Sequence, residues 1–177
     1  VSKMFIGRKE ELNFLEDRYN SADGQLIVLY GRRRVGKTEL LRQFCQDKEH
    51  IFYTCTEIID EKQLEAFSQR LLEKNHQAAK YITHFSDWEQ ALLSITELAK
   101  EKKIVVVIDE FPYMVKGNNA IPSILQKLWD EVLKQSNVML ILCGSAMSFI
   151  EKEVLAEKNP LYGRATGILK MQAMDFY

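Results

Sequence analysis

The sequence has few prolines and glycines, no long hydrophobic run and no excess of charge of either sign. Three prolines and eight glycines in 177 residues exclude a collagen-like or low-complexity chain. The longest uninterrupted apolar runs, 104–108 and 138–143, fall far short of the ~20 residues that a membrane span requires. No charged and then apolar leader opens the chain, and the net charge of −1 gives no global field for nucleic acid. We therefore expect a globular, cytoplasmic protein without a membrane segment.

Cysteine is also scarce, and its pattern excludes a disulfide framework. The three cysteines, Cys45, Cys55 and Cys143, are an odd number without the spacing of a metal-binding pair. Each lies in an apolar segment, which predicts buried, reduced thiols. A hydrophobic fraction of 46% is ordinary for one globular domain, and a chain of this length needs no covalent staple to stabilise its core.

Short apolar segments alternate along the chain with segments that have helical spacing. The predicted strands are 25–30, 51–56, 104–109, 138–143 and 168–171. The predicted helices are 8–19, a helix directly after Gly36, one around 64–71, then 88–99, 121–133 and 147–155. Ser86 and Glu89 are predicted to form a capping box at the start of the helix 88–99. Strands that are apolar throughout are buried on both faces, so the pattern predicts an α/β fold, a three-layer αβα sandwich around a parallel sheet.

A phosphate-binding loop is the strongest motif in the sequence. Residues 31–38 read GRRRVGKT and fit the pattern G-x-x-x-x-G-K-[ST] between a predicted strand and a predicted helix. Glycines let the backbone N–H groups converge on phosphate oxygens, Lys37 can reach the β- and γ-phosphates, and the Thr38 hydroxyl can ligate Mg²⁺. The alternative is a basic turn without a ligand. The residues expected to bind nucleotide are Gly31, Arg32, Arg33, Arg34, Val35, Gly36, Lys37, Thr38 and Glu39.

The three consecutive arginines of this loop have two interpretations. Arg32, Arg33 and Arg34 can form a solvated rim that raises the local potential for a polyanion. Alternatively, one of them touches a phosphate or a neighbouring subunit.

A pair of acids, Asp109 and Glu110, follows the apolar strand 104–109. Ligands gather at the carboxyl ends of parallel strands, so we expect these acids to lie beside the phosphate loop. Asp109 is placed to hold Mg²⁺, and Glu110 to orient or deprotonate the attacking water. The alternative is a capping or solvent-facing pair of carboxylates.

Two further polar residues are candidates for the chemical step. Ser145 follows the strand 138–143 and can hydrogen-bond the attacking water or the γ-phosphate; the alternative is a small residue in a turn. Arg164 precedes the last strand and can reach a γ-phosphate in the same subunit or in a neighbour. Its alternative role is that of a loop arginine with a surface partner.

Several motifs in order carry a resemblance to a known family. The segments 5–12 (FIGRKEEL), 31–38 (GRRRVGKT), 108–113 (IDEFPY), 144–145 (GS) and 160–164 (PLYGR) resemble the archaeal-type ATPase family of prokaryotes, in the STAND branch of the AAA+-like P-loop ATPases. The resemblance implies the sheet order 5-1-4-3-2, with 31–38 as Walker A and Asp109 and Glu110 as Walker B. It also implies that Ile6, Gly7 and Arg8 border the adenine or ribose.

The chain departs from this family pattern in two respects. Many STAND proteins carry an arginine after the position of Ser145, where this chain has Ala146. Members of the family also continue into a helical lid, a winged-helix region and often a nuclease-like domain. The resemblance therefore implies that residues 1–177 are the ATPase core alone, without the lid and the C-terminal domains.

The expected function is Mg²⁺-dependent binding and hydrolysis of ATP to ADP, driving a conformational or assembly switch. A second hypothesis is a regulatory module that binds nucleotide with negligible hydrolysis. A third, the weakest, is a small-molecule kinase. A homo-oligomer would form if Arg164 acts on a neighbour, and a link to DNA in the full-length protein follows from the resemblance alone.

Overall fold

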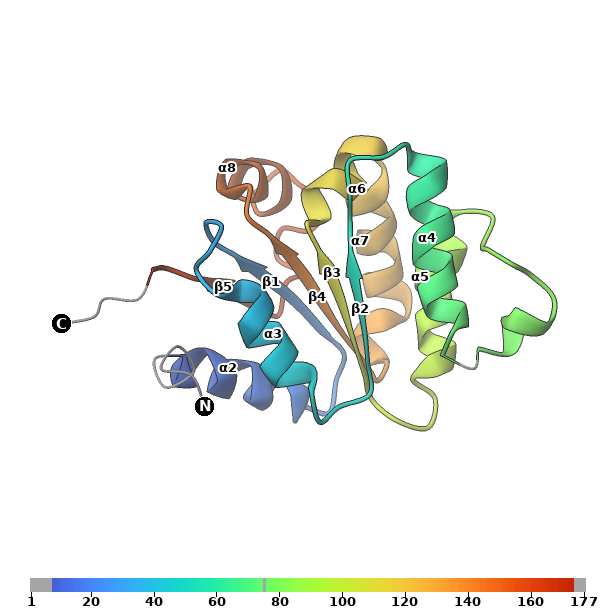
Figure 1. The fold of residues 1–177 in the computed structure, drawn as a ribbon, viewed down its shortest axis with the longest axis horizontal. Helices are drawn as coiled ribbons and strands as arrows, with labels where there is room; N and C mark the ends of the chain where they lie inside the picture. Colours follow the sequence, from blue (N-terminus) through green and yellow to red (C-terminus); the bar gives the residue numbers. More distant parts are fainter. Residues whose placement is uncertain (1–7, 75, 174–177) are drawn as a thin grey trace.

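The computed structural model describes residues 8–74 and 76–173. A five-stranded sheet forms its centre, with helices on both faces (Figure 1). The strands are β1 (Gln25–Tyr30), β2 (His50–Thr54), β3 (Ile104–Asp109), β4 (Val138–Gly144) and β5 (Gly167–Lys170). Their order is β2-β3-β4-β1-β5, and all neighbouring strands are parallel. The predicted α/β sandwich and the order 5-1-4-3-2 are therefore confirmed.

The buried central strands explain the apolar runs of the sequence. Every residue of β1, β3 and β4 is buried, because helices cover both of their faces. The edge strands β2 and β5 contain half-exposed and exposed residues as well as buried ones. In the register of the sheet, Tyr30 lies beside Gly144, and Ile108 lies beside Leu142. This register aligns the ends of three strands that carry the predicted site.

The helices follow the prediction with some changes at their ends. They are α2 (Lys9–Tyr19), α3 (Lys37–Cys45), α4 (Asp60–Leu72), α5 (Trp88–Leu98), α6 (Phe111–Gly117), α7 (Ile121–Glu131) and α8 (Met147–Phe149). Two short 3₁₀ helices occur at Gln77–Lys80 and Leu133–Gln135. The predicted helix 147–155 divides into α8 and a π turn at Ile150–Val154. Helix α6 was not among the predicted elements.

The predicted capping box of α5 is wrong. Asp87, not Ser86, caps this helix, and its carboxylate accepts a hydrogen bond from the backbone N–H of Gln90 at 2.8 Å. Glu89 does not reach back to the cap, because it pairs with Lys127 of α7 at 2.5 Å. Glu89 therefore contacts a neighbouring helix and does not form the predicted capping-box hydrogen bond within α5.

The two faces of the sheet have separate hydrophobic cores. Helices α2 and α3 cover one face, where Leu15 and Phe44 join the cluster of Ile27 and Ile141. Helices α4, α5, α6 and α7 cover the other face with a larger cluster, which includes Phe67, Trp88 and Leu125. In Figure 1, α4 and α5 lie to the right of β2, and α7 lies behind the sheet. All three cysteines are buried, as the sequence predicts.

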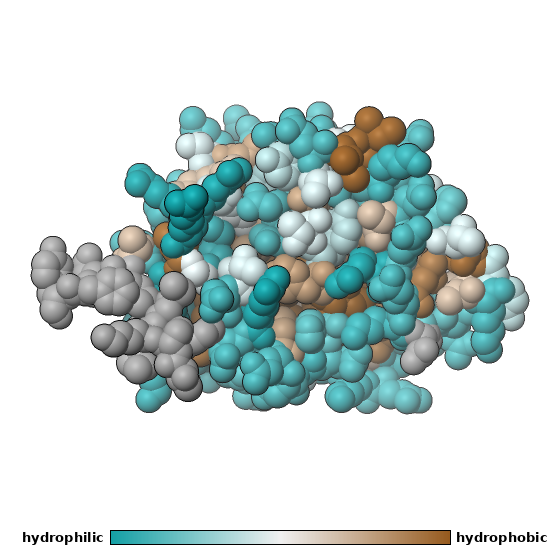
Figure 2. All heavy atoms as spheres, viewed as in Figure 1, coloured by the Kyte–Doolittle hydropathy of each residue, from teal (hydrophilic) through white to brown (hydrophobic). Residues whose placement is uncertain are grey.

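The surface is mainly hydrophilic on the face that Figure 2 shows, with small separate groups of hydrophobic side chains. The most exposed large apolar residues of the described chain include Tyr81, Ile59 and Ile168. Within the described residues, no helix combines the length and the hydrophobicity needed to cross a bilayer.

Candidate functional site

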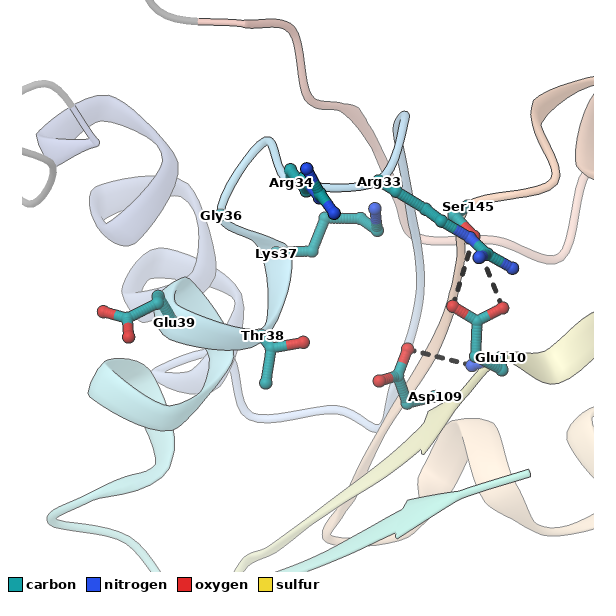
Figure 3. Close-up of a pocket in the computed structure, with 9 residues that line it drawn as sticks. All are labelled: Arg33, Arg34, Gly36, Lys37, Thr38, Glu39, Asp109, Glu110 and Ser145. Atoms are coloured by element: carbon teal, nitrogen blue, oxygen red, sulfur yellow. Dashed lines mark hydrogen bonds between the residues drawn. The ribbon is translucent and has the colours of Figure 1, made fainter. Parts of the chain in front are cut away.

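The carboxyl ends of β1, β3 and β4 bring three distant segments of the chain together. They surround a cavity of about 420 Å³ (Figure 3). Its lining residues are Arg33, Arg34, Gly36, Lys37, Thr38, Glu39, Asp109, Glu110 and Ser145. The phosphate loop, the acidic pair and Ser145 thus lie at one place, as the parallel sheet requires of residues that follow adjacent strand ends.

The phosphate loop has the tight backbone that its glycines predict. Gly36 has φ 95° and precedes α3, and Arg34 has φ 65°, in the left-handed region that few side chains adopt. Gly31 is close to the chain beyond β5, since a Cβ at this position would lie 2.5 Å from the backbone oxygen of Met171. The loop therefore needs a glycine at both ends, one for its dihedral angle and one for space.

Lys37 is almost fully buried and bonds to the loop that precedes it. Its Nζ donates hydrogen bonds to the backbone oxygens of Gly31 at 2.7 Å and Arg32 at 2.8 Å. Burial lowers the pKa of Lys37, while the nearby Cys143, Glu110 and Asp109 partly oppose this effect. The ammonium group therefore sits in the cavity wall, close to both acids.

The acidic pair is held in a defined geometry. Asp109 ends β3 with 8% of its surface exposed, and its Oδ1 accepts a hydrogen bond from the backbone N–H of Glu110 at 2.9 Å. Glu110 has φ 53° and ψ 41° at the start of α6, a conformation that costs a non-glycine residue about 1–3 kcal/mol. Ser145 Oγ donates to Glu110 Oε1 at 3.2 Å. Strain and a hydrogen bond thus fix the carboxylate that faces the cavity.

Cys143 of β4 neighbours Asp109 without lining the cavity, a position that the sequence did not predict. Burial raises the pKa of the Cys143 thiol well above its ordinary value, and the neighbouring Asp109 raises it further. The raised pKa keeps this thiol protonated. Only the pairing of β4 with its neighbours could have revealed this position, because the surrounding sequence is that of an apolar strand.

The donor atoms fit a magnesium ion bound together with phosphate. Figure 3 shows the Thr38 hydroxyl pointing toward Asp109 across the cavity. Mg²⁺ prefers oxygen ligands, takes few from the protein and completes its octahedron with water and phosphate oxygens. In the described part of the chain, no group of three His, Cys, Asp or Glu residues could hold a metal ion by itself. Thr38 and Asp109 therefore fit a shared site and not an all-protein cage.

Arg32 and Arg8 lie on the other side of the loop. Arg32 and Val35 line a second cavity of about 330 Å³, together with residues that follow β5. Arg8 is 4% exposed, and its Nη2 donates to the backbone oxygens of Val35 at 2.5 Å and Gln172 at 2.8 Å. Arg8 therefore braces the back of the loop. Ile6 and Gly7, which were expected beside the adenine or ribose, lie outside the described residues.

The structure does not place Arg164 in the phosphate cavity. Its Nη2 pairs with Asp130 Oδ2 at 3.1 Å, near the end of α7. From there the chain turns into the amino end of β4 at Val138. Arg164 thus lies toward the end of the sheet opposite the phosphate loop, and has the surface partner that its alternative interpretation foresees.

Comparison with known sequences identifies a family that matches most of the chain. Residues 5–177 match a family described as an ATPase domain predominantly from Archaea. An uncharacterized protein of Methanocaldococcus jannaschii is 36% identical over 173 residues, which are 98% of this chain and 37% of that protein. An uncharacterized ATP-binding protein of the same organism is 56% identical over 46 residues, or 26% of this chain and 78% of that protein.

Solved structures share the fold. A Walker-type ATPase of Pyrococcus abyssi superposes with a TM-score of 0.69 at 24% identity, over 95% of this chain and 54% of that one. The Orc1 protein of Aeropyrum pernix, solved in complex with DNA, gives a TM-score of 0.65 at 14% identity, over 93% of this chain and 45% of that one. The chain spans only 37% of the longer M. jannaschii relative. By its match over almost the whole sequence, the chain belongs to the family of ATPase domains found predominantly in Archaea.

Proposed function

We propose that this domain binds Mg·ATP and hydrolyses it to ADP and phosphate. The supporting observation is the cavity that brings Lys37, Thr38, Asp109 and Glu110 together from two strand ends. Such a combination of cation, hydroxyl and paired acids matches the needs of phosphoryl transfer, which depends on positioning and on stabilisation of charge. The finer placement in the STAND branch rests on the order of the sequence motifs.

Binding of the triphosphate falls to the loop and to Lys37. The loop amides and the amino end of α3 attract phosphate oxygens. Lys37 changes partners in this step, since its ammonium leaves the backbone oxygens of Gly31 and Arg32 for the β- and γ-phosphates. The resemblance in the segment 5–12 is the support for proposing that Ile6, Gly7 and Arg8 border the base or ribose.

Thr38 and Asp109 hold the metal ion in this proposal. When bound, Mg²⁺ would neutralise negative charge on the phosphates. Asp109 receives the backbone N–H of Glu110 on one oxygen, which orients its carboxylate in the cavity. The Thr38 hydroxyl faces the same space from the first turn of α3.

Glu110 activates the attacking water. Its carboxylate takes a proton from the water as the water oxygen bonds to the γ-phosphorus, and the bond from that phosphorus to the bridging oxygen of ADP breaks. Ser145 holds the Glu110 carboxylate by its hydrogen bond at 3.2 Å, and we assign it this positioning role.

Two other functions make different demands on the same cavity. A regulatory module would bind Mg·ATP and release no phosphate, and a small-molecule kinase would transfer the phosphoryl group to an acceptor other than water. The Glu110 carboxylate in the cavity favours water as the acceptor. The use of the cycle as a conformational or assembly switch, and a link to DNA in a longer protein, belong to this proposal and not to the observed geometry.

The proposal is tested by titrating Mg·ATP and Mg·GTP while phosphate release is measured. We expect slow release that needs Mg²⁺, stops in EDTA and prefers ATP. Nucleotide binding without any release, also in a longer natural chain, would support the regulatory module instead. Labelled phosphate on a small acceptor would support the kinase.

The proposed role of Arg164 is confined to a neighbouring copy of the chain. The Asp130 pair keeps its guanidinium away from the cavity of its own chain. If Arg164 completes the site of a neighbour, phosphate release per chain rises with protein concentration. A flat profile would contradict a role in an oligomer.

A further inference from the structure

The three arginines of the phosphate loop divide between two sides of it. Arg32 lines the second cavity, on the side of β5 and Met171, whereas Arg33 and Arg34 line the phosphate cavity. All three are exposed, so their positions do not come from burial in the core. The three consecutive arginines thus have different surroundings in the folded chain.

Arg33 is the arginine directed at the acidic side of the cavity. Figure 3 shows its side chain leaving the loop and extending toward Ser145 and Glu110, past the ammonium of Lys37. Burial lowers the pKa of Lys37, and the positive charge of Arg33 lowers it further, which agrees with this placement. Across the described residues, no carboxylate lies within ion-pair distance of Arg33, in contrast to the Arg164–Asp130 pair. Its guanidinium is therefore a cation whose hydrogen-bond donors are available.

The Glu110 side of the cavity needs a cation that the other residues do not supply. A water held by Glu110 must meet the γ-phosphate there, so two anionic groups come together as further charge develops. Lys37 reaches from the wall of the loop, and Arg164 lies at the other end of the sheet. Among the nine lining residues, the remaining cations are Arg33 and Arg34, and Arg33 is the one that points to Glu110.

We propose that Arg33 is the arginine that contacts the γ-phosphoryl oxygens during hydrolysis, supplied by the phosphate loop of the same chain. This inference rests on the proposed ATPase function and names its catalytic cation. The planar guanidinium can donate two parallel hydrogen bonds to phosphoryl oxygens and remains charged throughout the reaction. It exchanges no proton, because Glu110 takes the proton of the water. This contact does not depend on a residue of a neighbouring chain.

The test compares three variants of the whole chain. Arg33→Ala should lower kcat by about 100-fold while the Kd of Mg·ADP changes by less than about 3-fold, because the contact forms mainly in the transition state. Arg33→Lys keeps the positive charge but loses the pair of parallel guanidinium donors, so this variant should recover part of the loss. Arg42→Ala is the matched control: it removes one exposed arginine from α3 outside the phosphate cavity, and should leave kcat within about 2-fold of wild type.

A binding measurement supports the kinetic one. Fluoroaluminate with ADP mimics the transferring phosphoryl group, and we expect it to increase the affinity of the wild type for ADP but not that of Arg33→Ala. The loss in kcat should be the same at low and high protein concentration. An Arg33→Ala variant with a kcat within about 3-fold of wild type and the same gain with fluoroaluminate would overturn this inference alone. Absence of phosphate release from the wild type would contradict the proposed function and this inference with it.

Discussion

The two ends of the sheet are built differently. At the carboxyl end, Lys37, Asp109 and Glu110 crowd a cavity, and two non-glycine residues adopt positive φ. At the amino end, polar groups are paired: Lys103 Nζ donates to the backbone oxygens of Tyr19 at 2.7 Å and Ser21 at 2.6 Å. The carboxyl end leaves charged groups facing a cavity and carries backbone strain. At the amino end, the charged group of Lys103 has hydrogen-bond partners.

This difference indicates where stability and the proposed activity reside. Groups that face a cavity with spare donors and acceptors contribute little to folding, because their desolvation offsets their bonds. Groups at the amino end close the connections between strands and helices. Substitutions should therefore separate into those that remove turnover and those that remove stability.

The strongest test of this contrast is Lys37→Ala. We expect phosphate release to fall by at least about 100-fold, since the variant loses a cation on the transferring group. The free energy of unfolding should change by less than about 1 kcal/mol, because the cost of burying the ammonium opposes its two hydrogen bonds. Release assays and urea denaturation of the same preparation measure both effects. A large loss of stability would contradict the distinction between the two ends.

Glu110→Gln should have the next largest effect. Glutamine keeps the size of the side chain and an oxygen that accepts from Ser145, but it takes no proton from water. We expect kcat to fall by about 100-fold with Mg·ATP affinity within about 3-fold of wild type. Single-turnover kinetics and equilibrium binding separate the two quantities. Retained turnover would remove Glu110 from its role as base.

Gly24→Ala addresses the amino end. A Cβ at this position would lie 2.0 Å from the backbone oxygen of Leu133, so the chain must move to admit it. We expect a loss of about 1–3 kcal/mol in the free energy of unfolding. The folded fraction should keep its kcat. Gly117→Ala is the control, because the nearest atom to its Cβ is 3.7 Å away; an equal loss there would contradict the steric explanation.

The smallest effect is expected from Arg164→Ala. The Asp130 pair is partly exposed, so we expect the melting temperature to fall by less than about 2 °C at neutral pH. The hydrogen bond from Arg164 lowers the pKa of Asp130 in the folded chain. The stabilisation is therefore present above the unfolded-state pKa and disappears as the pH falls through the lowered one. Thermal unfolding of both proteins across this acid range checks the sign, and a difference that grows in acid would contradict it.

Much of the fold could be predicted from the sequence because the apolar composition of the central strands indicates that they are buried. β1, β3 and β4 are apolar throughout, and the loop 31–38 has a pattern tied to one kind of backbone. The order of the strands came from the resemblance to a family and not from periodicity. The meeting of Lys37 with Asp109 then follows from the geometry of parallel strands.

Other features depend on contacts that the local sequence does not show. Helix α6 has seven residues and includes a proline near its start, so it reads as a loop; burial of Phe111 and Met114 stabilises it. The direction of Arg164 depends on Asp130, which lies 34 residues earlier in the chain. Arg32 and Arg33 line different cavities because of the backbone conformation of the loop, which a run of identical residues does not reveal.

The bonds of Lys37 to Gly31 and Arg32 also bear on the thermodynamics of recognition. They cross-link the loop to the first turn of α3 within the chain itself. In the proposed function, the entropy of ordering this loop is then lost when the domain folds and not when a phosphate binds. By the same proposal, the affinity for phosphate reflects an exchange of ammonium partners, from two peptide oxygens to phosphate, more than the ordering of a flexible loop.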